Sequence, residues 1–133
     1  MIVLRLENEY GQGIYTSGLA TQICYEMDDP DLAHDTFGPH PTPSYDSRLI
    51  AEGYNKLVHV HYLFAFTSFE QYRAWFFNDE FLNHLGEHNI SLALYEVEHL
   101  DMIIGNAQCV FDPGSAMPVG RFDPLTPKED LPL

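Results

Sequence analysis

The sequence predicts one small α+β domain with a compact mixed or antiparallel sheet and two to four short helices. The chain has 133 residues, of which 45% are hydrophobic and 14% aromatic, so it can bury one real core. Short β-branched segments alternate with capped segments of helical periodicity, and neither type dominates. We find no internal repeat. We therefore expect a single domain over residues 1–123 and a loose, proline-rich tail over residues 124–133.

The first elements are read from the amino-terminal segment. Ile2–Leu6 is short, apolar and β-branched, which predicts a strand. Residues 7–13 contain two glycines and predict a turn. Ser17 is then expected to cap a helix that runs to about Met27, because apolar residues recur there at helical spacing.

The composition changes between residues 28 and 47, where four prolines and five aspartates predict a long surface loop. Asp46 is expected to cap a short helix that reaches about Gly53. The apolar segment Leu57–Phe66 has the strongest strand pattern in the chain, so we predict that it is the central strand.

Two further helices are predicted from their capping residues. Ser68 and Gln71 have the spacing of a capping box. Asn78 is expected to cap the next helix, which Gly86 would end. Four strand segments follow, the middle two joined as a hairpin across Gly105-Asn106: Ile90–Val97, Met102–Ile104, Gln108–Phe111 and Val119–Phe122.

The charge excludes several kinds of partner. Twenty acidic residues against six basic ones give a net charge of −14, which leaves no basic footprint for direct nucleic-acid binding or for an anionic membrane. No apolar run reaches membrane-spanning length and no signal-peptide pattern is found, so a cytoplasmic protein is expected. The acidity indicates either simple solubility or a surface that mimics DNA phosphates toward DNA-binding proteins. The oligomeric state is left open.

Arg5 and the glycine segment after it are the first candidate site. Arg5 lies in the middle of the first predicted strand, where it could clamp a phosphate or ribose, or pair with Glu7 or Glu9 on the surface. Gly11 and Gly13 then precede a predicted helix, which would let the backbone approach a ligand closely.

Histidines offer a metal alternative. His59 and His61 would share one face of the predicted central strand, and His84 and His88 are spaced for one helical face. Because Gly86 is expected to break that helix, and a histidine pair on a sheet is more often packed in a core, we predict no metal site. His61 is instead expected to line a cleft beside Arg5.

Residues 11–27 resemble the Gly-x-Gly-Ile-Tyr-Phe segment and following helix of ADP-ribosyltransferases of the poly(ADP-ribose) polymerase type. Residues 106–112 are similar to the strand that carries the catalytic glutamate of that family. The resemblance implies an ADP-ribosyltransferase-like fold with NAD as substrate. It implies catalytic positions at Arg5 and Gln108, and NAD contacts from Arg5, Gly13, Tyr15 and Ser17, with His61 beside them. Gln108 stands where the family has glutamate, so any mono-ADP-ribosyl transfer is expected to be weak or absent.

A second resemblance covers more of the chain. Residues 64–71, 74–76, 93–97 and 108–111, with the His-Pro-x-Pro stretch at 40–43, are similar to a family of small phage and prophage proteins. This resemblance implies a phage protein acting in the cytoplasm of its host. It leaves an alternative function open: an acidic anti-defence inhibitor that binds a host protein, with residues 26–35 as its most acidic run.

Overall fold

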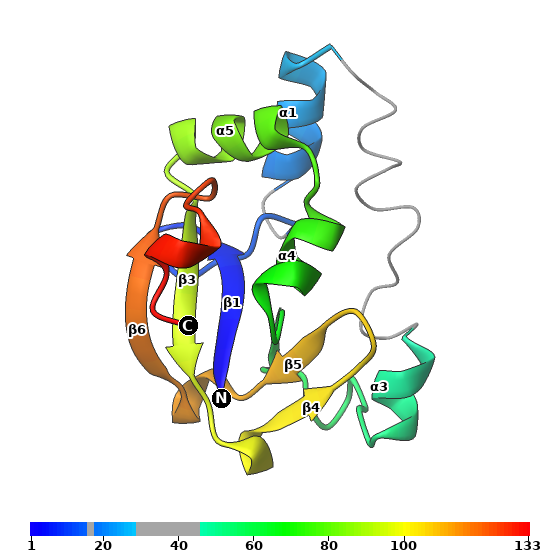
Figure 1. Ribbon diagram of the computed structural model, residues 1–133. Coiled ribbons are helices and arrows are strands. Elements are labelled where there is room, and N and C mark those ends of the chain that lie inside the picture. The colour runs from blue at the N-terminus through cyan, green and yellow to red at the C-terminus, as the bar shows by residue number, and fades with distance from the viewer. Residues whose placement is uncertain (16–17, 29–45) are drawn as a thin grey trace.

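The structure, a computed structural model, describes residues 1–15, 18–28 and 46–133 (Figure 1). Its strands are β1 (Ile2–Glu7), β2 (Leu63–Ala65), β3 (Ser91–Glu96), β4 (Met102–Ile104), β5 (Cys109–Phe111) and β6 (Met117–Phe122). Its α-helices are α1 (Leu19–Glu26), α3 (Ser47–Ala51), α4 (Phe69–Trp75) and α5 (Asp79–Glu87). Short 3-10 turns lie at η2 (His99–Asp101), η3 (Pro113–Ser115) and η4 (Lys128–Asp130). The predicted α+β class is therefore confirmed.

The described strands form two three-stranded antiparallel sheets, ordered β1-β3-β6 and β2-β5-β4. One antiparallel bridge joins them: Leu4 and Phe66 exchange backbone hydrogen bonds of 2.9 and 2.8 Å. The six strands consequently follow one another as a single bent layer, β6-β3-β1-β2-β5-β4, which Figure 1 shows running from the vertical strands to the lower hairpin.

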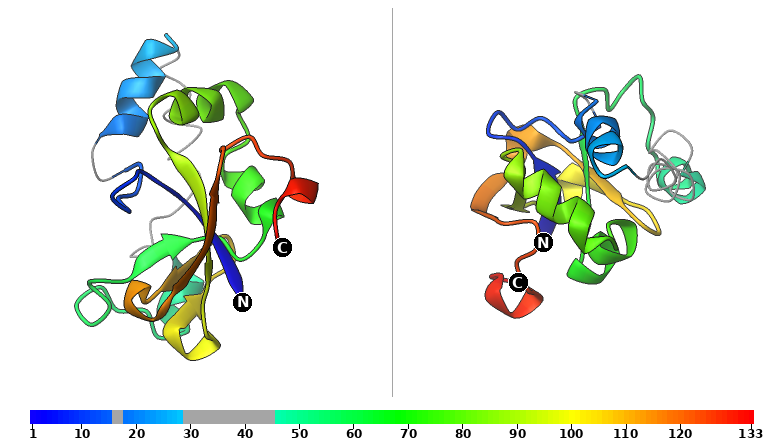
Figure 2. Two further views of the ribbon diagram at one scale, coloured as in Figure 1. Left: turned by 90° about the vertical axis from the view of Figure 1, so that its left-hand side faces the viewer. Right: turned by 90° about the horizontal axis from the view of Figure 1, so that it is seen from above.

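Helices cover one face of this layer. α1 and α5 lie side by side at one end of the strands in Figures 1 and 2, and α4 joins them in the main core. The largest fully buried side chains of that core include Leu4, Phe66, Tyr72 and Phe81. Val3 and Phe111 belong to a second, smaller cluster, which includes residues on the opposite face of the strands because successive side chains alternate.

The three predicted helix caps between residues 46 and 78 are confirmed. Asp46 Oδ1 accepts the Arg48 and Leu49 N–H groups, both at 3.1 Å. Ser68 Oγ accepts the Gln71 N–H at 3.1 Å, and Asn78 Oδ1 accepts the Phe81 N–H at 2.9 Å. Each cap uses a side chain within three positions of its donor, so the short-range sequence signal is sufficient.

Two details of these helices differ from the prediction. The Gln71 carboxamide oxygen accepts the N–H of Thr67 at 3.0 Å, one residue earlier than a capping box requires. α5 passes through Gly86 and ends at Glu87. A Cβ atom at position 86 would lie 3.2 Å from Asp123 Oδ2 and 3.5 Å from Pro124 Cδ, so the glycine allows close packing inside the helix and does not end it.

The prediction of a central strand over Leu57–Phe66 is wrong for its first half. Only Leu63–Ala65 is a strand, and Leu57 and Val60 are 83% and 79% exposed. Asn55 organises a turn instead: its Oδ1 accepts the Leu57 N–H at 2.9 Å and its carbonyl accepts the His59 N–H at 2.8 Å. A local side-chain acceptor thus satisfies backbone donors that the apolar pattern assigned to a sheet.

The carboxyl-terminal prediction of a loose tail is also wrong. Leu131 is buried in the main core, and the Tyr72 hydroxyl donates to the Pro124 carbonyl at 2.7 Å. Lys128 pairs with Glu70 of α4. An apolar anchor and two polar ones therefore hold this segment, which a count of prolines does not reveal.

The helix predicted to run to about Met27 is present as α1. α1 begins at Leu19 with Gly18 as its N-cap in a left-handed conformation (φ 72°). Ser17, the predicted cap, lies outside the described residues, as does almost all of the predicted loop over residues 28–47.

Candidate functional site

The candidate site lies where β1 and β2 separate. The register set by Leu4 and Phe66 would next place Leu6 opposite Phe64, but the described strands form only the one bridge. The Phe64 carbonyl, which faces β1, accepts a hydrogen bond of 2.9 Å from Arg5 Nη1 instead. A guanidinium thus takes the place of a strand N–H at the opening between the two sheets.

Two further groups close to Arg5 in the sequence hold its guanidinium. Its Nε donates to Glu7 Oε2 at 3.1 Å, and its Nη2 lies 3.5 Å from the Gly11 carbonyl. The side chain is only 5% exposed. Burial lowers the pKa of Arg5 from its usual value, and the adjacent Glu7 carboxylate opposes that shift. Of the two roles left open for Arg5, the pairing with Glu7 is present, but it is buried and not on the surface.

Glu7 is the centre of a buried polar network. Its side chain is fully buried, and its Oε1 accepts hydrogen bonds from Arg121 Nη1 at 3.0 Å and from the Tyr95 hydroxyl. Burial, reinforced by the bond to Glu7, raises the pKa of Tyr95 to about 12, so this hydroxyl remains a donor. Two arginines and a tyrosine therefore surround one carboxylate, which fixes the position of Arg5.

A cavity of about 220 Å³ opens beside the guanidinium. Its lining consists of Arg5 at one side and mostly aromatic or apolar groups elsewhere: Gly13, Tyr15, Tyr54, Tyr62, Leu63, Phe64 and Val110. We call this cavity the cleft. A planar ring of a ligand could stack on its aromatic side chains, and an acceptor atom of the ligand could bond to the Arg5 guanidinium.

Gly13 and Tyr15 form part of the cleft wall next to Arg5. A Cβ atom at position 13 would lie 3.0 Å from Arg5 Nη2, so the glycine makes room for the guanidinium. The Tyr15 ring stacks on Phe64 with centroids 5.9 Å apart, and its hydroxyl accepts the Trp75 indole N–H at 2.9 Å. Burial raises the pKa of Tyr15, which keeps the phenol neutral.

The structure brings some of the sequence-predicted residues together and not others. Arg5, Gly13 and Tyr15 line the same cleft. Gln108 is buried elsewhere, with its Nε2 donating to Asp46 Oδ2 at 3.1 Å, and it is not among the lining residues. His61 does not line the cleft either: its imidazole is more than half exposed and lies 3.6 Å from Asp112.

Sequence reasoning missed Tyr54 and Tyr62. Both line the cleft, and both contact the ring of His59, at centroid distances of 5.9 and 4.7 Å. The strand predicted over Leu57–Phe66 puts Tyr62 in a sheet, and Tyr54 lies just before that segment. Two tyrosines flanking an Asn-centred turn are the signal that would have placed both rings on one side of a loop.

Within the part of the chain that the structure describes, no group of three or more His, Cys, Asp or Glu side chains is arranged to hold a metal ion. His88 bonds to Glu26 of α1 at 3.0 Å. Cys24 and Cys109 are both buried, and burial raises the pKa of Cys109 to about 12.

Fold and cleft together define a small acidic α+β protein with a buried arginine in the wall of an aromatic cavity. The model of the Bacteriophage T4 Y00F protein family matches residues 1–125, and the chain belongs to that family. The match confirms the predicted phage character of the protein. No curated protein and no solved structure matches the chain significantly. No helix in the described ranges is long and apolar enough to cross a membrane.

Proposed function

We propose that the cleft binds NAD, with one ring of the cofactor seated against the tyrosines and an acceptor oxygen directed at Arg5. The observation that supports this proposal is that Arg5, Gly13 and Tyr15, three of the residues that the ADP-ribosyltransferase resemblance puts at the nucleotide, line one cavity. The proposal includes an ADP-ribosyltransferase-like arrangement of the bent antiparallel layer.

The size and polarity of the cleft limit how the cofactor would lie. A volume of about 220 Å³ is smaller than a typical ligand pocket, so it suits one ring and part of a ribose while the remainder extends over the rim. The Arg5 guanidinium has more N–H donors than the hydrogen bonds it makes to described residues. The remaining N–H groups can donate to a carboxamide or phosphate oxygen of the cofactor.

In this proposal the protein binds NAD but transfers little or no ADP-ribose. Among the described lining residues none is a carboxylate, and transfer develops positive charge on the ribose. Loss of one well-placed electrostatic group costs about 10²–10³ in rate. Replacement of Gln108 by glutamate would place the new carboxylate against Asp46 and not in the cleft, so it is not expected to restore transfer.

Calorimetry tests this proposal. Wild-type protein is expected to bind NAD, and Tyr62→Ala is expected to weaken binding about tenfold, because one ring stacked on an aromatic side chain contributes about 1–3 kcal/mol. Tyr25→Ala, the same change at an exposed tyrosine of α1, serves as the control. If wild type takes up no NAD at millimolar concentration, or if both variants bind equally well, the nucleotide proposal fails.

A second candidate function, an acidic inhibitor of a host protein, is favoured by the arrangement of charge. Four of the six basic side chains lie in ion pairs: Arg5 and Arg121 with Glu7, Arg73 with Asp79, and Lys128 with Glu70. These pairs use only three carboxylates, so the chain keeps a large excess of acidic charge that would attract a basic partner.

Salt dependence distinguishes this second function. Binding to a purified basic DNA-binding protein of a bacterial host, followed by fluorescence anisotropy, is expected at 0.1 M salt and is expected to disappear toward 1 M salt. The screening length falls from about 10 Å to about 3 Å over that range. Binding that does not change with salt would argue against an electrostatic mimic.

A further inference from the structure

Among the residues that the structure describes, β4 is the edge strand of its sheet and no strand pairs with its outer side. Gly105 N–H donates to the Gln108 carbonyl and Asp112 N–H to the Asp101 carbonyl, both at 2.8 Å. In an antiparallel pair the hydrogen-bonding direction alternates along the strand, so the intervening residues Met102 and Ile104 turn their backbone groups away from β5. The Met102 N–H bonds to His99 of η2. The Ile104 N–H and the Met102 and Ile104 carbonyls remain directed outward.

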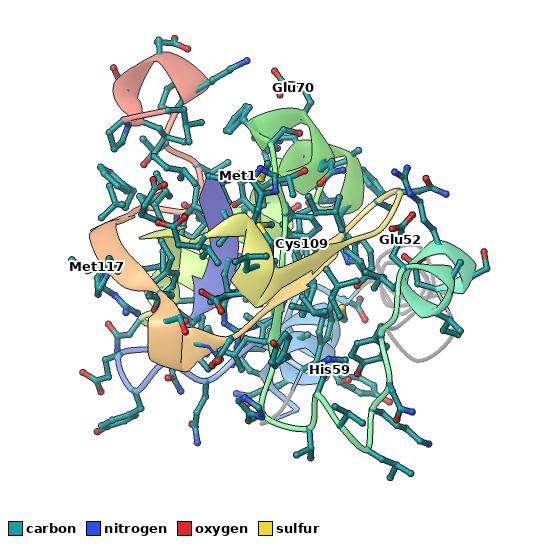
Figure 3. The ribbon with its side chains drawn as sticks, turned by 90° about the horizontal axis from the view of Figure 1, so that it is seen from below. Met1, Glu52, His59, Glu70, Cys109 and Met117 are labelled. Carbon is teal, nitrogen blue, oxygen red and sulfur yellow. The ribbon has the colours of Figure 1, made fainter. Side chains whose placement is uncertain are left out.

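A groove of about 310 Å³ runs along this edge. It is lined by Arg48 and Glu52 on the α3 side and by His99, Met102, Ile103 and Ile104 on the other. Three consecutive strand residues have side chains on alternating faces, so a groove that touches all three lies along the strand edge and not on one face. Figure 3 looks toward this edge from below, with the labelled Glu52 beside it.

The α3 wall of the groove is fixed in place. Gly105, at the hairpin turn, approaches α3 so closely that a Cβ atom there would lie 2.9 Å from Leu49 Cγ. Arg48 Nη1 donates to Asn106 Oδ1 at 2.8 Å across the same contact. The spacing between helix and strand edge is therefore set by packing, as a groove that receives an extended chain requires.

We propose that this groove binds an extended segment of a partner protein, which adds a strand to β4 and places a lysine or arginine beside Glu52. Outward backbone groups supply the hydrogen bonds, and the apolar residues Met102, Ile103 and Ile104 border the groove. Arg48 is engaged with Asn106, whereas Glu52 has no ion-pair partner among the described residues. Glu52 is the acidic side chain that a lysine or arginine in the groove can reach, and the net charge of −14 favours a basic segment over an acidic one.

The charge also disfavours a second copy of this chain as the occupant. Two protomers of charge −14 would meet edge to edge, each bringing Glu52 to the same groove. The β4 groove is separate from the cleft, which has no lining residue in common with it, so the inference does not depend on NAD binding.

Backbone NMR of the full chain titrated with the peptide acetyl-Val-Lys-Val-Thr-Val-amide tests the proposal. Shift changes are expected at Ile104 and its β4 neighbours and at Glu52. Two N-methylated versions of the peptide, called twins, are compared with it. One twin is methylated at the odd-numbered residues and the other at the even-numbered residues, so each blocks the amides on one edge of the extended peptide. The twin that blocks the amides facing β4 is expected to bind at least tenfold more weakly. Equal binding of both twins, shifts elsewhere, or no shifts at millimolar peptide would overturn the proposal.

Two variants complete the test. Ile104→Pro removes the outward N–H while leaving the β4–β5 hydrogen bonds, because proline is tolerated on the free side of an edge strand, and peptide binding should be lost. Glu52→Lys should weaken binding of the lysine peptide, while Glu80→Lys on α5 makes the same charge change far from the groove and should not. If Glu80→Lys has an equal effect, or if Ile104 signals broaden with protein concentration in the absence of peptide, the assigned occupant is wrong.

Discussion

Glu7→Gln is expected to destabilise the fold by about 3–5 kcal/mol, because it removes the negative charge from a buried site occupied by two arginines. Arg5 would keep its positive charge at 5% exposure with only carbonyl acceptors remaining. The amide also cannot accept from Arg5, Arg121 and Tyr95 as strongly as a carboxylate does.

Urea denaturation at neutral pH measures this loss. Glu9→Gln makes the same chemical change two residues away at an exposed position and is expected to alter stability by no more than about 0.5 kcal/mol. Arg5→Met combined with Glu7→Gln should cost less than the sum of the two single changes, since the residues share one network. Equal stability of Glu7→Gln and Glu9→Gln would show that the network contributes little to the fold.

Phe66→Ala is expected to cost about 3–5 kcal/mol, the range for truncation of a buried phenylalanine. The side chain is 1% exposed and its ring lies between the rings of Phe64, Tyr72, Trp75 and Phe76, at centroid distances of 5.7, 6.0, 5.6 and 5.9 Å. The substitution leaves a cavity beside the only backbone bridge between the two described sheets, where few neighbouring groups can move in.

The matched control is Phe77→Ala. Phe77 is 53% exposed, so its truncation should change the free energy of unfolding by no more than about 0.5 kcal/mol. Both variants are compared with wild type by urea denaturation, with a common slope as a check on two-state unfolding. Similar losses in the two variants would mean that burial does not distinguish these positions.

The candidate site was only partly predictable. Arg5, Gly13 and Tyr15 lie within eleven residues of one another, so a turn after the first strand brings them together without distant help. Tyr54, Tyr62 and Val110 reach the cleft from segments far along the chain. The hairpin turn before Gln108 was predicted correctly, but the direction of the Gln108 side chain was not. It bonds to Asp46, because α3 packs against this hairpin.

The sequence by itself determined the features whose causes are local. Asp46, Ser68 and Asn78 cap their helices because each side chain bonds a donor two or three residues away, and Met102–Ile104 pairs with Cys109–Phe111 across a four-residue turn. The excess of acid needs no structure at all. These features follow from short-range geometry and composition, which the order of residues contains directly.

Only the tertiary structure decided where β1 meets β2, that Asn55 would turn the apolar segment away from the sheet, and that Leu131 would anchor the tail. It also left the edge of β4 open beside α3 and enclosed Glu7 between two arginines. Each outcome depends on which distant surfaces compete for the same apolar area or hydrogen bond. Local propensity is too weak to settle that competition, because packing energies between elements exceed it.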